Sequence, residues 1–195
     1  MKTIKNTFYF IITIILLSGF DTGASDNPGQ INVMGYYMAP RDNYQPQNLP
    51  LDKLTHIIFS FTEVIDNEMK FRNFASGDKL TLLVDQKKNH PHLKVMIACG
   101  GWGGSGGFSD MAATADNRKV FVKSVIEFIE EYKLDGLDMD WEYPGMYGAG
   151  NPYRPEDREN FTYLMKELRE SLDATGKKLL LTFASAGWKK YYDYV

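Results

Sequence analysis

Short apolar runs alternate with helical patterns along the chain after residue 30. The runs are rich in Ile, Val, Leu, Met and Phe and do not alternate strictly with polar residues, which is typical of parallel strands covered on both faces. We predict five strands, at Ile31–Met38, Thr55–Phe61, Lys94–Cys99, Leu134–Trp141 and Leu179–Ala184.

Three helical patterns lie between these runs. The clearest, from Asn117 to Tyr132, places its apolar residues on one stripe with charges opposite. A second begins near Pro155 and ends by Gly176, and a weaker one covers Lys79 to Lys88. Strands that alternate with helices predict an α/β fold, either an open doubly wound sheet or a (β/α) barrel.

The first 24 residues have the pattern of an export signal. Lys2 and Lys5 precede an almost wholly apolar stretch, Phe8 to Leu17, and small residues at 22–24 suit cleavage. The stretch is about half of the roughly 20 residues that a membrane-spanning helix needs, which disfavours a membrane anchor. We predict a signal peptide over 1–24, a polar linker over 25–30, and a secreted domain over 31–195, extracellular or periplasmic.

Composition narrows the function classes. With 44% hydrophobic and 24% charged residues the chain is an ordinary globular sequence, and its net charge of −3 disfavours a broad contact with nucleic acid or anionic membrane. The single cysteine, Cys99, cannot form an internal disulfide. His56, His90 and His92 lack metal-ligand spacing to one another, so we predict no zinc site.

Carboxylates follow one another along the fourth predicted strand. Side chains alternate on a strand, so Asp138, Asp140 and Glu142 are expected on one face, with apolar residues on the other. Burying each charge unpaired costs several kcal/mol, so this arrangement indicates function rather than stability. Mutual repulsion keeps at least one carboxyl protonated near neutral pH, and we predict Glu142 as the acid that protonates a leaving group.

Two other readings of these acids are weaker. The run lacks the Gly and Glu positions of a calcium loop and has no His nearby, which disfavours a divalent-metal site. The regular interleaving of Leu, Met and Trp disfavours solvated loop charges. Asp135 differs in parity, so we interpret Asp135 and Gly136 as structural residues at the turn into the strand.

A glycine-rich segment follows the third predicted strand. Gly101-x-Gly103-x-x-Gly106 matches a dinucleotide-binding turn, but that turn requires its third glycine to open a helix directly, and we expect residues 108–116 to intervene. We interpret the glycines as allowing a close approach of the backbone to a ligand, with Trp102 free to face it. A plain flexible loop is the alternative.

The acidic run resembles the signature of a known family. Asp135-x-x-Asp138-x-Asp140-x-Glu142, followed by Tyr-Pro, resembles glycoside hydrolase family 18, the family of chitinases and endo-β-N-acetylglucosaminidases. Other segments resemble the first three strands of that family: residues 35–37, 55–61 and 98–102.

The resemblance implies a (β/α)8 TIM barrel and a glycosidase. A complete barrel has about 250 residues, so we expect about the first five βα units here, in a truncated chain. The implied function is a chitinase that hydrolyses β-1,4 linkages between N-acetylglucosamine units by substrate-assisted retaining catalysis, without a cofactor. Chitin or N-acetylglucosamine oligosaccharides are the implied partners. An endo-β-N-acetylglucosaminidase acting on glycoprotein glycans and a non-catalytic chitin-binding protein remain as alternatives.

The resemblance also implies roles for single residues. Glu142 is the general acid and then the base, Asp140 orients the acetamido group of the substrate, and Asp138 shares a proton with Asp140. One position departs from the family pattern, because Ala98 stands where a serine hydroxyl is usual. The implied sugar-contacting residues are Gly101, Trp102, Gly103, Tyr143, Tyr36 and Phe61.

Overall fold

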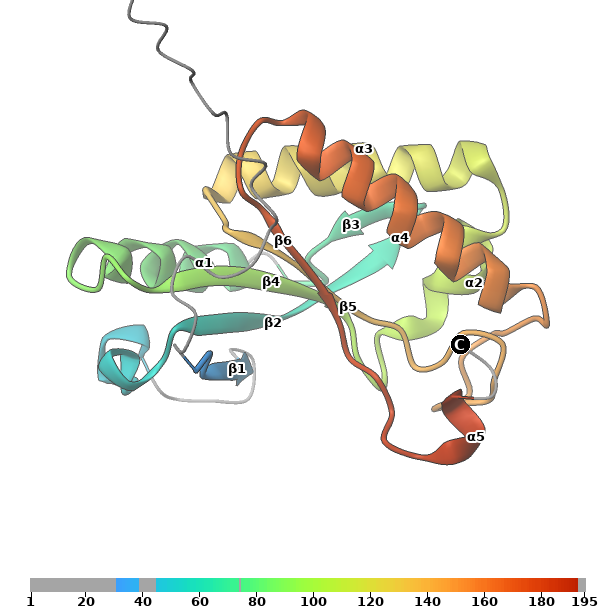
Figure 1. The fold of residues 1–195 in the computed structure, drawn as a ribbon, viewed down its shortest axis with the longest axis horizontal. Helices are drawn as coiled ribbons and strands as arrows, with labels where there is room; N and C mark the ends of the chain where they lie inside the picture. The colour runs from blue at the N-terminus through green and yellow to red at the C-terminus, as the bar shows by residue number, and fades with distance from the viewer. Residues whose placement is uncertain (1–30, 39–44, 74, 193–195) are drawn as a thin grey trace, which may run out of the picture. The chain divides into compact units, whose positions relative to one another are not determined.

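The computed structural model describes residues 31–38, 45–73 and 75–192 (Figure 1). The predicted signal peptide over 1–24 and the predicted linker over 25–30 lie outside the described residues. No helix within the described ranges is long and apolar enough to cross a bilayer.

Five parallel strands form the sheet, in the order β1-β2-β4-β5-β6. This order follows the chain without reversal, whereas a doubly wound sheet reverses its strand order at a switch point. The arrangement therefore fits part of a (β/α) barrel, and all five predicted strands are confirmed with small differences at their ends. The bounds are β1 (Met34–Met38), β2 (His56–Ile65), β4 (Lys94–Gly100), β5 (Gly136–Asp140) and β6 (Leu180–Phe183).

Helices connect and cover the strands, and the three predicted helices are confirmed. Figure 1 shows the two longest, α3 (Ala115–Tyr132) and α4 (Asp157–Ala174), beside each other on one face of the sheet, where they contact one another. Shorter elements complete the described chain: α1 (Ala75–Asp85), α2 (Phe108–Ala112), α5 (Lys189–Tyr192) and the 3-10 turns η1 (Pro46–Asn48), η2 (Leu51–Lys53), η3 (Gln86–Lys88) and η4 (Ser105–Gly107).

The core lies between the sheet and these helices. Leu137 and Met139 of β5 are fully buried, and Trp141 stacks on Phe108 of α2 with ring centroids 5.2 Å apart. Phe161 of α4 meets the same indole edge-on at 5.8 Å. The predicted apolar face of the acidic strand is thus the face that packs under the helices, which directs Asp138 and Asp140 to the opposite face.

One prediction about secondary structure is wrong. The segment 108–116 was expected to separate the glycine-rich loop from the next helix, yet α2 begins at Phe108, directly after η4. Its five residues bury Phe108, Met111 and Ala112 on one side, which is too short a stretch to show a helical period. The argument from this segment against a dinucleotide-binding turn therefore does not hold.

The strand β3 (Glu68–Lys70), which pairs antiparallel with the end of β2, was not predicted from the sequence. The turn between them consists of Asp66 and Asn67, both with positive φ, which suits a two-residue hairpin. The hairpin lengthens β2 beyond the predicted strand. Its short strand carries charges at both ends, Glu68 and Lys70, so its composition does not distinguish it from a loop.

Candidate active site

Asp138 lies at the base of the acidic site and accepts two hydrogen bonds. The Tyr36 hydroxyl of β1 donates to its Oδ2 at 2.7 Å, and the Thr182 hydroxyl of β6 donates to its Oδ1 at 2.5 Å. Burial, followed by the bond to Asp138, raises the pKa of Tyr36, so this hydroxyl remains a donor. Ala98 of the neighbouring strand β4 pairs with Asp138 without offering a hydroxyl, and the two hydroxyls come from the neighbouring strand β6 and from β1 at the far edge of the sheet.

Asp140 lies two residues further along the same face and is 8% exposed. Burial, then the charge of Glu142 and then that of Asp138, raise the pKa of Asp140 from 3.8 to about 7. A carboxyl with this pKa is protonated in a large fraction of molecules at neutral pH. The sequence predicted at least one protonated carboxyl in this group and assigned it to Glu142, whereas the raised pKa falls on Asp140.

Glu142 lies just beyond the end of β5 and is half-buried, as expected for a residue that follows the predicted strand Leu134–Trp141. The strand ends because the chain leaves the sheet after Asp140, where the Glu142 N–H donates to Ser105 Oγ at 2.9 Å instead of to a neighbouring strand. Next to it, burial, a hydrogen bond with the Glu142 side chain and nearby negative charges raise the pKa of Tyr143 to about 12.

A pocket of about 360 Å³ opens above these acids. Five residues predicted for the site line it: Tyr36, Phe61, Asp140, Glu142 and Tyr143. Asp138 lies beneath, 2% exposed and bonded to Tyr36. The remaining lining residues were not predicted: Met38, Ala184, Ser185, Ala186 and Trp188.

The glycine-rich loop stands beside the pocket without lining it. Trp102 is 57% exposed, and its ring meets Tyr143 edge-on at 6.2 Å. Gly101 has φ +83, and a Cβ there would lie 3.1 Å from the Phe61 ring, so the loop can pass over Phe61 only with glycine at this position. Gly103 faces open space. Trp102 is therefore available to a ligand that extends out of the pocket.

Asp135 and Gly136 lie at the opposite end of β5. The Asp135 Oδ2 accepts from the Val95 N–H at 2.8 Å and from Lys87 Nζ at 2.6 Å. A Cβ on Gly136 would lie 2.4 Å from the Leu180 carbonyl oxygen, so only glycine allows β6 to pair at this point. Both contacts join β5 to neighbouring elements far from the acidic pocket.

Several supporting residues escaped the sequence reasoning. Thr182 carried a usable signal, since the predicted strand Leu179–Ala184 places it beside the acidic strand. Asn151 and Trp188 lie on loops and Ser105 opens the short turn η4, where periodicity gives no information about direction. Trp188 contacts the Tyr143 ring at 5.2 Å and closes one side of the pocket.

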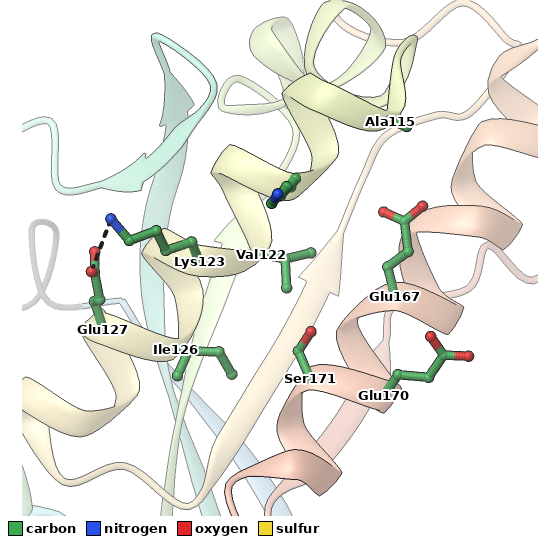
Figure 2. Close-up of a pocket in the computed structure, with 9 residues that line it drawn as sticks. Ala115, Val122, Lys123, Ile126, Glu127, Glu167, Glu170 and Ser171 are labelled. Atoms are coloured by element: carbon green, nitrogen blue, oxygen red, sulfur yellow. Dashed lines mark ion pairs between the residues drawn. The ribbon is translucent and has the colours of Figure 1, made fainter.

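A larger hollow of about 590 Å³ lies elsewhere, between α3 and α4 (Figure 2). Figure 2 shows Val122 and Ile126 of α3 facing Ser171 of α4, with charged side chains around them. These charges have partners on the helices: Lys123 pairs with Glu127 at 3.4 Å, for example. The hollow is distant from the carboxyl ends of the strands, and we place the candidate active site in the smaller, acidic pocket.

Metal-ligating side chains form no cluster among the residues that the structure describes. No group of three or more His, Cys, Asp or Glu side chains within those ranges is arranged to hold a metal ion. Asp138 instead accepts hydrogen bonds from Tyr36 and Thr182.

The fold and the site define an α/β protein with an acidic, aromatic-lined pocket at the carboxyl ends of its parallel strands. The family model described as Glycosyl hydrolases family 18 matches residues 32–195, and the chain belongs to this family. The family resemblance stated from the acidic motif is thereby confirmed.

Individual relatives carry chitinase names. The chain is 49% identical over 110 residues to chitinase A1 of Niallia circulans, covering 54% of this chain and 16% of that protein. It is 39% identical over 156 residues to an endochitinase of Manduca sexta, covering 72% and 26%. Among solved structures, the chitinase domain of the spore coat protein CotE from Clostridium difficile matches with a TM-score of 0.73 and 36% identity, covering 89% of this chain and 47% of that one. The chain thus spans about a quarter or less of the length of the Niallia circulans and Manduca sexta proteins.

Proposed function

We propose that the protein is a chitinase that hydrolyses β-1,4 linkages between N-acetylglucosamine units. The observation that carries this proposal is the pocket in which Asp140 and Glu142 face a space walled by Tyr36, Phe61 and Tyr143. Aromatic rings bind the apolar faces of sugar rings, Glu142 provides proton transfer at the linkage between two sugars, and Asp140 provides a hydrogen bond to the acetamido group. The family and the chitinase names of the relatives support the same substrate class.

The proposed reaction uses the acetamido group of the substrate as the nucleophile. Its carbonyl oxygen attacks the anomeric carbon while Glu142 protonates the departing oxygen, and the C–O bond breaks to leave an oxazolinium ring. Glu142 then removes a proton from water as the water oxygen bonds to the anomeric carbon, and the bond between that carbon and the oxazolinium oxygen breaks, which reforms the acetamido group and restores the configuration. This route differs from the scheme with two enzyme carboxylates, in which one of them is the nucleophile.

Asp140 and Asp138 are proposed to serve the acetamido group. With its pKa raised to about 7, Asp140 has a proton to donate in a hydrogen bond near neutral pH. Asp138 is held by Tyr36 and Thr182 and is the neighbouring acceptor with which Asp140 shares that proton. We propose that Asp140 orients the acetamido group toward the anomeric carbon and stabilises the charge that develops on it.

Hydrolysis of chitotetraose by the chain and by Glu142→Gln tests this proposal. We expect cleavage with β-anomeric product forming first in ¹H NMR, and a loss on the order of 10²- to 10⁴-fold in Glu142→Gln, the usual contribution of a general acid and base. Glu127→Gln is the matched control, since Glu127 is exposed on α3 and pairs with Lys123. Equal rates for Glu142→Gln and the unchanged chain would contradict the proposal.

The same assay separates the alternative substrates. Cleavage of a glycoprotein glycan but not of chitotetraose would identify an endo-β-N-acetylglucosaminidase, and binding of chitotetraose without cleavage would identify a sugar-binding protein. We also propose secretion, because residues 1–24 have the pattern of an export signal. Mass spectrometry of the culture medium is expected to find a chain that begins at residue 25.

A further inference from the structure

The peptide group of Glu142 is held by two side chains from other segments. The last sheet-like bond at this edge runs from the Gly101 N–H to the Asp140 carbonyl oxygen at 2.8 Å. Two residues after Asp140, the Glu142 N–H donates to Ser105 Oγ at 2.9 Å, and the Glu142 carbonyl oxygen accepts from Asn151 Nδ2 at 3.2 Å. The position of Glu142 therefore depends on these two side chains rather than on strand pairing.

Both side chains also hold the glycine-rich loop. Ser105 Oγ lies 2.9 Å from the Gly101 carbonyl oxygen and 3.1 Å from the Asp140 carbonyl oxygen. The single proton of the hydroxyl is shared between these two acceptors. Asn151 Nδ2 donates to the Trp102 carbonyl oxygen at 3.0 Å. Ser105 is fully buried, so water does not replace its hydroxyl at low cost. The peptide of Glu142 and the loop that carries Trp102 are thus fixed to each other.

We propose that Ser105 and Asn151 are positioning residues for Glu142 and set the point from which its carboxyl enters the pocket. Neither side chain lines the pocket, so both act through the Glu142 peptide. The inference rests on the proposed function, in which Glu142 protonates the leaving oxygen. Misplacement of a catalytic group by about 1 Å lowers the rate on the order of 100-fold, because reacting atoms must meet within a narrow geometry.

Two substrates that differ in their need for an acid test the inference. In chitotetraose the leaving group is the hydroxyl oxygen of the next sugar, which must be protonated as it departs. In 2,4-dinitrophenyl chitobioside the leaving group is a phenolate, which departs without protonation. For Ser105→Ala and Asn151→Ala we expect kcat/KM, which reports only the step that releases the leaving group, to fall roughly 10- to 100-fold on chitotetraose and less than about 3-fold on the dinitrophenyl substrate.

Matched controls come from a serine and an asparagine outside the site whose side chains also bond to the main chain of other residues. Ser124 accepts from the Met69 N–H at 2.9 Å and donates to the Phe121 carbonyl oxygen, and Asn117 Nδ2 donates to the Asp110 carbonyl oxygen at 3.0 Å. Ser124→Ala and Asn117→Ala are expected to leave the ratio of the two rates unchanged. Equal losses on both substrates in Ser105→Ala and Asn151→Ala would overturn the inference, because a general loosening of the fold slows both reactions alike.

A second readout does not require activity. Hydrogen exchange of the Glu142 amide, followed by NMR, is expected to accelerate at least about tenfold in Ser105→Ala and to stay unchanged in Ser124→Ala. An unchanged exchange rate in Ser105→Ala would overturn the inference, even in a chain that cleaves neither substrate. Failure of the unchanged chain to cleave either substrate would contradict the proposed function, and amide exchange would still decide whether Ser105 holds Glu142.

Discussion

Replacing Asp140 with asparagine is expected to stabilise the fold at alkaline pH. The pKa of Asp140 rises from 3.8 to about 7 in the folded chain, because the carboxylate is buried and faces Glu142 and Asp138. At about 1.4 kcal/mol for each tenfold change in proton affinity, this corresponds to an upper bound of about 4 kcal/mol. Since Asp140 borders a pocket open to water, screening lowers the value, and we expect about 2 kcal/mol.

The sign of the effect follows from proton binding. Between pH 3.8 and about 7 the folded state binds more protons at Asp140 than the unfolded state does, so its contribution to stability falls as pH rises through this window. Asp140→Asn removes the ionisation and with it the loss. The variant should therefore match the unchanged chain near pH 4 and exceed it by the full amount at pH 8.5.

Urea unfolding followed by tryptophan fluorescence at pH 4 and pH 8.5 measures this difference. Asp85→Asn is the control, because Asp85 has a half-exposed side chain that pairs with Lys88 on the surface. We expect Asp85→Asn to change the free energy of unfolding by less than about 0.5 kcal/mol at both values of pH. If Asp140→Asn gave the same change at both pH values, the raised pKa of Asp140 would be refuted.

Three further substitutions probe the surroundings of the site. Tyr36→Phe leaves the Oδ2 of the buried Asp138 without its donor, so urea unfolding at pH 7 is expected to show a loss of about 1 to 3 kcal/mol, and no loss would show that water replaces the hydroxyl. Asp157→Ala removes the acceptor of two Ser109 Oγ contacts at 2.8 and 2.9 Å at the start of α4, and calorimetry is expected to show a lower Tm by several degrees; an unchanged Tm would refute this support. Trp102→Ala removes an exposed ring beside the pocket, so calorimetric titration with chitotetraose should show binding weaker by about tenfold at unchanged Tm, and equal affinity would exclude Trp102 from the binding site.

Hydrophobic patterns predicted the elements that are covered by others. The central strands β2, β4 and β5 are largely buried, and α3 and α4 are long enough to show a full helical stripe. The edge strands β1 and β6 are mostly half-buried or exposed but carry the same apolar runs. The same reasoning failed for α2 and β3. Both are only a few residues long, and each is held by contacts distant in sequence, such as the Met69 N–H donating to Ser124 Oγ. A local pattern carries no record of such contacts.

The same distinction separates the site residues that strand alternation predicts from those that tertiary contacts position. Alternation along one strand was enough to direct Asp138 and Asp140 away from the buried indole of Trp141, because strand geometry fixes where successive side chains point. Alternation also placed Glu142 with Asp140, and both line the pocket, but it did not show what holds Glu142 there, since its main chain is bonded by residues 37 and 9 positions away. A period of two ends where strand pairing ends, and beyond that point only tertiary contacts determine direction. Ser105 and Asn151 provide those contacts, so the geometry of the proposed acid depends on loops that the acidic motif does not include.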